Sequence, residues 1–338
     1  METFKPRKKT IIICIIILTV FLLLLISGGI FGLNSVNYYD KLTIEDVLQN
    51  EKRQQDFGCF NKTTPTAFGF ENYEDIKFIS PLNKKITLSG WYIRTGKTEL
   101  KDGRKLLLIT EGRWVNRLKA IKYLELIKNT GLDEYYDIYI GDMRNAGDSS
   151  EGNTGFGYNI AEDIAASLIY LNKTYKNNNF AVWGFSQSGM AAAILSDRKD
   201  LQNKLAINGV VIEKMILDSP MSNAFKMILK EAEQMHIPKI FAYMTYCCMN
   251  FDYKFYATKM HLGKLLETAP YPFLILQSKQ DQLTLYSFFE EESKKFSPEI
   301  SVKLFDSGAH VSSYLVSENK QIYEEEVRNF LIGKRFIY

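Results

Sequence analysis

A serine at an expected sharp turn of the backbone is the first candidate for chemistry in this sequence. Ser186 lies within WGFSQSG (residues 183–189), between an apolar run and a helix-like segment. A serine in a tight strand-to-helix turn needs small residues two positions away on either side, and Gly184 and Ser188 provide them. The pattern predicts a nucleophilic hydroxyl, with the backbone N–H of Gln187 directed at a developing oxyanion. The alternative is a turn serine that only ends a strand.

A nucleophilic hydroxyl needs a general base, which is most often a histidine. The sequence has three histidines, and His310 directly follows the apolar run 300–305. A base in a loop after a late strand is the expected arrangement for this kind of turn. His236 and His261 lie in a segment rich in methionine and aromatic residues with no strand before them, so surface or packing roles fit them better. We expect His310 to be the base.

Two aspartates compete for the role of the acid that orients the base. Asp281 follows the apolar run 273–277 and gives the chain order Ser, Asp, His, with one strand between each pair of partners. Asp218 ends the preceding run, 210–217, where a turn or a helix-capping role is common. Both aspartates would lie at the carboxyl edge of a sheet, where ligands bind. The chain order favours Asp281, and Asp218 remains the alternative.

The segments around these candidates alternate between strand-like and helix-like patterns. The expected strands are residues 76–80, 85–94, 105–110, 136–141, 180–184, 210–217, 273–277 and 300–305. The expected helices are residues 117–130, which stop at Gly131, 160–171 behind a cap at Asn159, 189–195, 285–294 and 318–331. Such alternation predicts the α/β class, with a doubly wound, mostly parallel sheet.

The alternation breaks between Asp218 and Pro272, where methionine and aromatic residues are dense. Residues 221–235 and 240–255 are helical in character. We expect a helical cap insertion over the sheet at about residues 220–268. Its apolar side chains either pack as core or line an acyl slot above Ser186.

An uncharged stretch at residues 11–33 comes before all of these elements. As a helix it would span roughly 34 Å, enough to cross the hydrocarbon core of a bilayer. The tail before it, residues 1–10, carries four basic residues: Lys5, Arg7, Lys8 and Lys9. They predict a cytoplasmic N-terminus and a single-pass signal-anchor, with the catalytic domain outside the cytoplasm at the cell membrane. A cleaved signal peptide is the alternative, although its apolar core would be unusually long and no A-x-A-like site follows.

Composition and net charge limit the class of protein and the partners that we expect. The 338 residues are 46% hydrophobic and 24% charged, a balance typical of globular proteins. A net charge of +3 is too small to indicate a nucleic-acid partner, and none is expected. Residues 34–74 are polar and without a clear period, so we expect a stalk and lead-in there, followed by one domain at residues 75–338.

Four cysteines are present: Cys14, Cys59, Cys247 and Cys248. They have no C-x-x-C or zinc-ligand spacing, so no metal site is expected. A disulfide between the two adjacent cysteines would be strained. Buried apolar thiols are favoured, and a disulfide from Cys59 to one of the pair stays open.

The chain resembles the α/β-hydrolase superfamily, in the branch of prolyl-oligopeptidase-like and monoacylglycerol-lipase-like serine hydrolases. The resemblance runs from residue 75 to the C-terminus. It rests on the turn around Ser186, on the pattern D-x-R-x-x-G-x-S at residues 142–149, and on the loops with Asp281 and His310. It implies acyl transfer to water by a serine, aspartate and histidine triad, without a metal or an organic cofactor, and a helical cap that shapes substrate choice.

Two features depart from the family pattern. Family members often carry His-Gly after the strand that supplies the second oxyanion donor, where this chain has Glu111-Gly112-Arg113. The backbone N–H of Arg113 is then the expected donor. Ser188 takes the place of the last glycine of the turn.

The expected activity is cleavage of a carboxylic ester or thioester, through an acyl-enzyme on Ser186, in a small-molecule acyl substrate that could be lipid-derived. Two alternatives stay open. One is a serine peptidase or amidase of the same fold, and the other is a non-catalytic, membrane-tethered binding protein.

Overall fold

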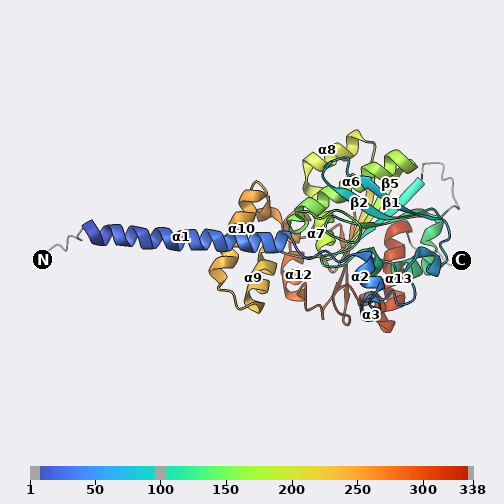
Figure 1. Ribbon diagram of the computed structural model, residues 1–338. Coiled ribbons are helices and arrows are strands. Elements are labelled where there is room, and N and C mark those ends of the chain that lie inside the picture. Colours follow the sequence, from blue (N-terminus) through green and yellow to red (C-terminus); the bar gives the residue numbers. More distant parts are fainter. Residues whose placement is uncertain (1–7, 96–103, 334–338) are drawn as a thin grey trace. The chain divides into compact units, whose positions relative to one another are not determined.

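The computed structural model describes residues 8–95 and 104–333 (Figure 1). The basic residues Lys5 and Arg7 of the expected cytoplasmic tail lie outside these ranges. The described residues form two compact units. The smaller unit contains residues 8–37 and 225–258, and the larger contains the rest.

Within the described residues, the larger unit is built on an eight-stranded sheet with the order β1-β2-β4-β3-β5-β6-β7-β8. The strands are β1 (Tyr73–Ile79), β2 (Thr87–Ile93), β3 (Arg104–Thr110), β4 (Tyr136–Asp142), β5 (Asn177–Phe185), β6 (Val211–Asp218), β7 (Phe273–Ser278) and β8 (Ile300–Phe305). β2 pairs antiparallel with β1 and β4, and all other neighbours are parallel. This confirms the predicted α/β class with a mostly parallel sheet.

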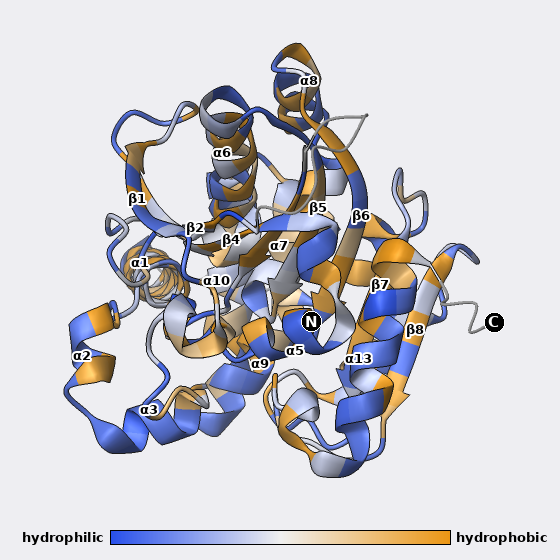
Figure 2. Cartoon of the chain, turned by 90° about the vertical axis from the view of Figure 1, so that its right-hand side faces the viewer, coloured by the Kyte–Doolittle hydropathy of each residue, from blue (hydrophilic) through white to orange (hydrophobic). Residues whose placement is uncertain are grey.

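Helices cover both faces of the sheet, because successive side chains of a strand point to opposite sides. Leu107 and Ile109 of β3 belong to the core with helices α4 (Arg117–Ala120), α5 (Tyr123–Thr130) and α13 (Ser317–Ile332). The equally buried Leu106 and Leu108 alternate with them and are absent from that cluster. The other helices of the sheet are α6 (Tyr158–Tyr175), α7 (Gln187–Asp197), α8 (Lys199–Ile207), α11 (Leu262–Leu265) and α12 (Tyr286–Ser293). Figure 2 shows hydrophobic and hydrophilic residues alternating along α13, as expected for a helix with one buried face.

Three details of the helices differ from the sequence-based expectation. The helix expected at residues 117–130 is divided into α4 and α5, although it ends as predicted at Gly131, which has a left-handed φ of 67°. Helix α6 begins after Gly157, and the side chain of Asn159 donates to the carbonyl of Asn153 instead of capping the helix. Helix α8 was not expected, because only Leu201 and Leu205 of its nine residues are buried.

Residues 38–74 are packed into the larger unit, so the interpretation of residues 34–74 as a stalk is wrong. They form α2 (Ile44–Leu48), α3 (Glu51–Phe57) and the short 3-10 helix η1 (Pro65–Phe68). The elements are held by local caps, such as the reciprocal hydrogen bonds between Thr43 and Asp46. Each contributes only one or two side chains to the core, which explains the missing periodicity. Val47 of α2 and Phe57 of α3 are buried in the core, together with Cys59 and Phe70, which lie outside the three helices.

The smaller unit consists of α1 (Lys8–Asn37), α9 (Ala224–Gln234) and α10 (Lys239–Asp252). By length and composition α1 is able to cross a membrane, and most of its side chains from Ile11 to Leu24 are exposed. The expected insertion therefore forms two helices, and α1 is their partner within this unit. Whether they also cap the sheet stays a prediction.

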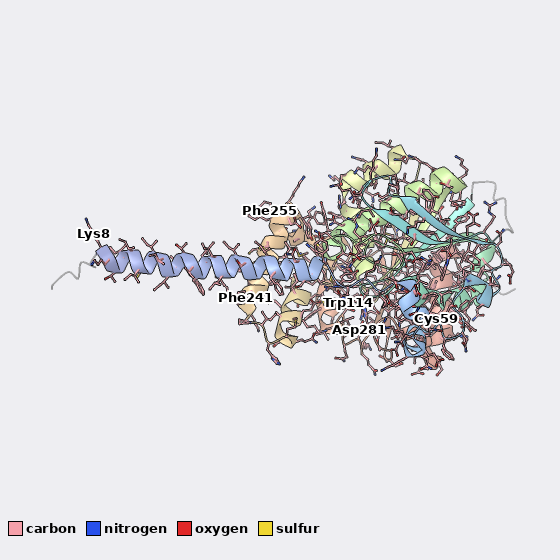
Figure 3. All side chains as sticks on the ribbon, viewed as in Figure 1. Lys8, Cys59, Trp114, Phe241, Phe255 and Asp281 are labelled. Carbon is pink, nitrogen blue, oxygen red and sulfur yellow. The ribbon has the colours of Figure 1, made fainter. Side chains whose placement is uncertain are left out.

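Glycines allow α1 and α10 to approach closely. A Cβ atom on Gly29 would lie 2.9 Å from the backbone carbon of Met244, and one on Gly32 would lie 2.0 Å from Oγ1 of Thr245. Phe241 of α10 fills the space beside Gly28. Figure 3 labels Phe241 next to α1. Small residues on one helix face permit this kind of backbone contact. The glycines of α1 are thus explained by packing within the unit.

All four cysteines lie in the described residues, and all are free. Cys59 is buried in the core of the larger unit, as the apolar interpretation expects. The disulfide that the sequence left open is not formed.

Candidate active site

Ser186 lies between β5 and α7, at the sharp turn that the sequence predicts. Its backbone has φ 53° and ψ −116°, a conformation that costs a non-glycine residue about 1–3 kcal/mol. The surrounding structure holds it there: the N–H of Ser186 donates to the carbonyl of Asp218, and the N–H of Met221 donates to the carbonyl of Ser186. A Cβ atom on Gly184 would lie 2.5 Å from the carbonyl oxygen of Ser188, so glycine is required there. The side chain of Ser186 is partly exposed.

His310 and Asp281 are brought together by the loops after β8 and β7. Nδ1 of His310 lies 2.7 Å from Oδ2 of Asp281, and the aspartate side chain is fully buried. Although burial alone would raise the pKa of Asp281, hydrogen bonds from His310 and Thr284 hold it below its usual value. Within the part of the chain that the structure describes, Nε2 of His310 is buried and has no hydrogen-bond partner. This ring nitrogen is therefore available to accept a proton.

Asp218, the alternative acid, has other partners. Its Oδ2 accepts a hydrogen bond of 2.5 Å from Tyr323, and its Oδ1 accepts one of 2.8 Å from Ser219. Burial raises the pKa of this carboxyl. No hydrogen bond joins Asp218 to His310 in the described residues, so the geometry supports Asp281 as the partner of the base.

Two residues of the site were missed by sequence reasoning. Thr284 donates to Oδ2 of Asp281 at 2.8 Å and, through its backbone N–H, to Oδ1 at 2.9 Å. Ser219 accepts at its hydroxyl from the N–H of Val311, and its carbonyl lies 3.2 Å from Oγ1 of Thr284. The segment after β6 thus contacts the loops of all three candidate residues. The only sequence signal for Thr284 is its place three residues after an aspartate, which is common in turns.

The loop Glu111–Arg113 passes directly beside the candidate nucleophile. A Cβ atom on Gly112 would lie 2.8 Å from Cβ of Ser186, so only glycine fits there. The hydroxyl of Ser188 donates to the carbonyl of Glu111, which ties this loop to the first turn of α7. The guanidinium of Arg113 stacks over the ring of Trp114, with 4.2 Å between Cζ and the ring centroid. These contacts fix the loop whose backbone N–H we expect to bind an oxyanion.

The carboxyl of Glu111 in this loop and the amine of Lys122 both have shifted pKa values. Burial raises the pKa of Glu111 to about 7, and burial lowers the pKa of Lys122 to about 7. Among the described residues, Oε1 of Glu111 and Nζ of Lys122 have no hydrogen-bond partner. Burial thus opposes the charged form of both groups.

The pattern at residues 142–149 stabilises the loop after β4. Asp142 accepts from the backbone N–H of Arg117 at 2.7 Å and pairs with its guanidinium. Arg144 forms a buried ion pair with Asp163, with 2.6 Å between Nη2 and Oδ1. A Cβ atom on Gly147 would lie 2.1 Å from the carboxylate of Asp142. These residues have structural roles that their spacing alone did not reveal.

The other two histidines lie away from this arrangement. Nδ1 of His261 lies 3.2 Å from Glu292 in the larger unit, and His236 is an exposed residue of the smaller unit. In the described residues, no group of three His, Cys, Asp or Glu side chains is placed to hold a metal ion.

Comparisons with known proteins agree with this architecture. No protein-family model matches the sequence, and no curated protein matches it. Solved structures do match. An esterase from Pyrococcus furiosus is 22% identical, with a TM-score of 0.58 over 79% of this chain and 94% of that chain. A hydrolase from Pseudomonas aeruginosa is 14% identical, with a TM-score of 0.51 over 77% and 98% of the two chains.

An α/β hydrolase from a Penicillium species is 12% identical, with a TM-score of 0.50 over 75% of this chain and 96% of that chain. Likenesses at such low identity concern the fold, and activity has to be argued from the residues of the site. The resemblance to one branch of serine hydrolases stays a prediction. The fold of this chain is that of the α/β-hydrolase superfamily.

Proposed function

We propose that this protein is a membrane-anchored serine hydrolase that cleaves a carboxylic ester or thioester through an acyl-enzyme on Ser186. The single observation that carries the proposal is the pairing of His310 with Asp281 at 2.7 Å, while the other ring nitrogen stays without a partner in the described residues. This arrangement gives the imidazole a fixed orientation and leaves Nε2 free for proton transfer.

In the proposed mechanism, Nε2 of His310 takes the proton of Ser186 as the serine oxygen attacks the substrate carbonyl carbon. The imidazolium then gives this proton to the leaving alcohol or thiol as its bond to the carbonyl carbon breaks. Water attacks the acyl-enzyme with the same base and releases the acid. The backbone N–H groups of Gln187 and Arg113 stabilise the oxyanion. Catalytic hydrogen bonds are often incomplete before substrate binds. The lack of a Ser186–His310 hydrogen bond among the described residues is therefore compatible with this role.

The length of helix α1 supports its proposed role as the membrane anchor. Its 30 residues would span about 45 Å, against a hydrocarbon core of about 30 Å. With the basic tail at residues 1–10 in the cytoplasm, the catalytic unit would lie on the other side of the membrane. Protease added to intact cells should then degrade that unit, and a carbonate wash should leave the protein in the membrane. Protection of the unit from external protease would reverse the proposed orientation.

A fluorophosphonate probe tests the nucleophile. We expect the wild type to be labelled at Ser186, and Ser186→Ala to lose both labelling and ester hydrolysis while it keeps the wild-type melting temperature. Ser301→Ala, at an exposed serine on β8, is the matched control and should behave as wild type. Full turnover by Ser186→Ala would contradict the mechanism. If the wild type is neither labelled nor active on esters, thioesters or aminoacyl amides, the non-catalytic alternative is favoured. Faster cleavage of amides than of esters would indicate the peptidase alternative.

A further inference from the structure

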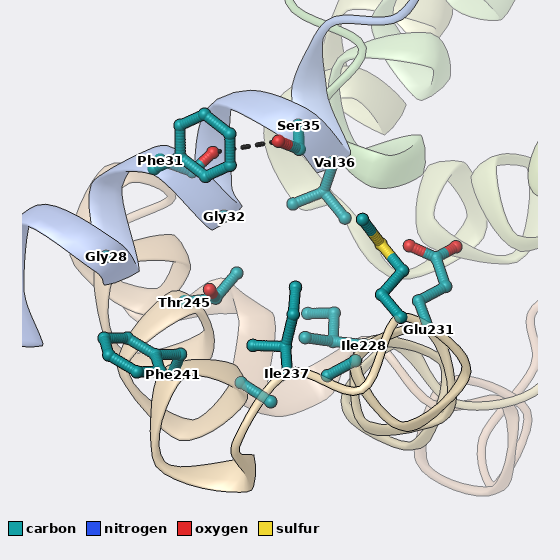
Figure 4. A pocket seen from close by; sticks show the side chains of 13 residues that line it. Gly28, Phe31, Gly32, Ser35, Val36, Ile228, Glu231, Ile237, Phe241 and Thr245 are labelled. Atoms are coloured by element: carbon teal, nitrogen blue, oxygen red, sulfur yellow. Dashed lines mark hydrogen bonds between the residues drawn. The ribbon is translucent and has the colours of Figure 1, made fainter.

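The smaller unit contains a cavity between α1 and the two helices of the insertion (Figure 4). Its volume is about 190 Å³. The walls are mostly apolar. Val36 of α1 lines the cavity together with Ile228 of α9, Ile237 of the turn and Phe241 of α10. Apolar cavities of about 150 Å³ can stay dry and take up apolar molecules. The lining therefore suits a hydrocarbon better than water.

The direction of α10 sets the level of this cavity along α1. Gly28 of α1 lies beside Phe241, Gly32 lies beside Thr245, and Asn37 accepts a hydrogen bond of 2.5 Å from Tyr253. The two helices therefore run in the same direction. The turn between α9 and α10 lies toward the apolar half of α1, and the end of α10 lies toward its C-terminus.

This level coincides with the edge of the expected hydrocarbon core. The uncharged part of α1 begins after Lys9, and a core of about 30 Å takes up about 20 residues of helix, to about residue 30. Gly28 and Phe241 would thus lie just inside the outer boundary of the core. The cavity begins at that depth and extends to Val36, on the side of the headgroups.

The exposed side chains near the turn fit the same depth. Met235 is 68% exposed, Ile240 46% and Tyr243 50%. From residue 234 to residue 251 the sequence has no acidic residue, and Lys239 is the only lysine or arginine. Apolar and aromatic side chains with an adjacent cation are typical of segments that lie in the membrane interface. In water these side chains would form an exposed apolar surface without a function.

From these observations we infer that the cavity between α1 and α9–α10 binds one acyl chain of a membrane lipid, with the turn between α9 and α10 embedded in the interface. The inference rests on the membrane anchor of the proposed function. A second copy of the chain is a poorer occupant, because α10 already packs against the glycine face of α1, which is formed by Gly28, Gly29 and Gly32. Lipid surrounds the exposed part of an anchored α1, so its local concentration is that of a solvent, and a modest affinity is enough to fill the site.

Photocrosslinking in the full-length protein tests this inference. The protein is reconstituted in phosphatidylcholine vesicles that contain a phosphatidylcholine with a diazirine in one acyl chain. After irradiation, adducts are mapped by mass spectrometry. We expect adducts along residues 11–24 of α1 and a second group on Ile228, Ala242 and Thr245, which are buried and line the cavity. The exposed side chains of the turn can react with surrounding lipid and are left out of the comparison.

Two variants fill the cavity from opposite walls. Ala232→Phe adds a ring from α9, and Val36→Phe adds one from α1; both residues are buried at the cavity. Each should remove the adducts on Ile228, Ala242 and Thr245 and keep those on residues 11–24. Ala206→Phe, at an exposed site on α8 in the larger unit, is the matched control and should change neither group. Circular dichroism of each variant checks that the helices still form.

The outcomes separate the two proposals. Adducts on residues 11–24 with none on Ile228, Ala242 and Thr245 in the wild type overturn the acyl site and leave the anchor intact. The same holds if adducts on these three residues persist in both folded cavity-filling variants. If residues 11–24 receive no adducts and carbonate releases the protein, the anchor itself is wrong, and the acyl site falls with it.

Discussion

The carboxyl ends of β6 and β7 each carry a buried aspartate, and the two are held in opposite ways. Asp218, the last residue of β6, accepts hydrogen bonds from the hydroxyls of Tyr323 and Ser219, and burial raises its pKa. Asp281, after β7, is also buried, but bonds from His310 and Thr284 overcome the effect of burial and lower its pKa. Neighbouring strands of one sheet thus hold two aspartates whose pKa values are shifted in opposite directions.

The difference shows that an aspartate at the sheet edge takes its role from its partner. A hydroxyl such as that of Tyr323 donates to either form of a carboxyl and carries no charge. An imidazole that becomes protonated during catalysis favours the ionised form. The loop after β8 brings His310 to Asp281, and Asp218 faces the helix that carries Tyr323. We therefore expect Asp281 to affect the reaction and Asp218 to affect mainly the stability of the fold.

The largest expected effect is on activity. Asp281→Asn should lower kcat/KM by about 10⁴-fold, because an amide neither holds the correct imidazole tautomer nor stabilises the imidazolium. Asp218→Asn is the matched control and should keep most of the wild-type kcat/KM per folded molecule. Steady-state kinetics on a p-nitrophenyl ester, with active sites counted by fluorophosphonate labelling, measures both. If Asp218→Asn is the inactive variant, the two roles are reversed.

The next effect is on stability. Asp218→Asn replaces one of the two carboxyl oxygens, which accept from Tyr323 and Ser219, by an NH2 group that cannot accept. The loss of an acceptor for a buried hydroxyl costs roughly 1–3 kcal/mol. Thermal melts should show a lower melting temperature for Asp218→Asn and for Tyr323→Phe. The double variant should lose less than the sum of the two, because both changes break the same bond. Full additivity would mean that the bond contributes nothing to stability.

A smaller change in rate is expected at Thr284, a positioning residue that acts through Asp281. Thr284→Val keeps the shape of the side chain and removes the hydroxyl that donates to Oδ2 of the aspartate. We expect kcat to fall by about tenfold, in line with the loss of one hydrogen bond to a charged group, with little change in KM. The acidic limb of the pH profile of kcat/KM should move to higher pH, because the carboxylate then attracts the imidazolium proton more strongly.

Thr130→Val is the matched control for this substitution. Thr130 is a buried threonine whose hydroxyl donates to the carbonyl of Leu126 within α5, remote from the aspartates in sequence. It should leave the pH profile unchanged. A profile that is unchanged in Thr284→Val as well would show that its hydroxyl has only a structural role.

The smallest expected effect concerns stability as a function of pH, where the two aspartates should differ in sign. The lowered pKa of Asp281 contributes stability that is present above the usual carboxyl pKa of about 4 and is lost as the pH falls through the folded-state value. The raised pKa of Asp218 contributes stability that is present below about 4 and is lost as the pH rises through the folded-state value.

Melting temperatures measured between pH 8 and pH 2 test this difference in sign, because the contribution of Asp281 changes only below about pH 4. The gap between the wild type and Asp281→Asn should shrink toward acid, and the gap between the wild type and Asp218→Asn should grow. Parallel trends for the two variants would contradict the opposite pKa shifts of the two carboxyls.

Much of this site could be predicted because its main residues have local signals. Ser186 sits in a turn that demands small neighbours, and the scarcity of histidine points to His310. Chain order favoured Asp281 over Asp218 without deciding between them. Ser219 and Thr284 carry no such signal, since hydroxyl residues are common in turns. Their roles arise only where loops 65 residues apart in sequence meet.

The fold, too, has parts with a local sequence signal and parts without one. Strands buried on both faces are continuous apolar runs, so their positions along the chain could be predicted, and the predicted α/β class is confirmed. Residues 38–74 were misinterpreted because their short helices have caps but no apolar period. The packing partner of α1 could not be predicted either. A glycine at position 29 or 32 indicates that another backbone approaches closely, but nothing in the sequence pattern indicates that this backbone is that of α10.

The pairing of α1 with α10 also has a consequence for the order of synthesis. Roughly 200 residues separate the end of α1 from the start of α10, and ribosomes add about 5–20 residues per second. The glycine face of α1 therefore stays without α10 for on the order of 10–40 s after its synthesis, while β1 to β6 are synthesised. The smaller unit contains the first described helix of the chain, yet it cannot be complete until most of the sheet has been synthesised.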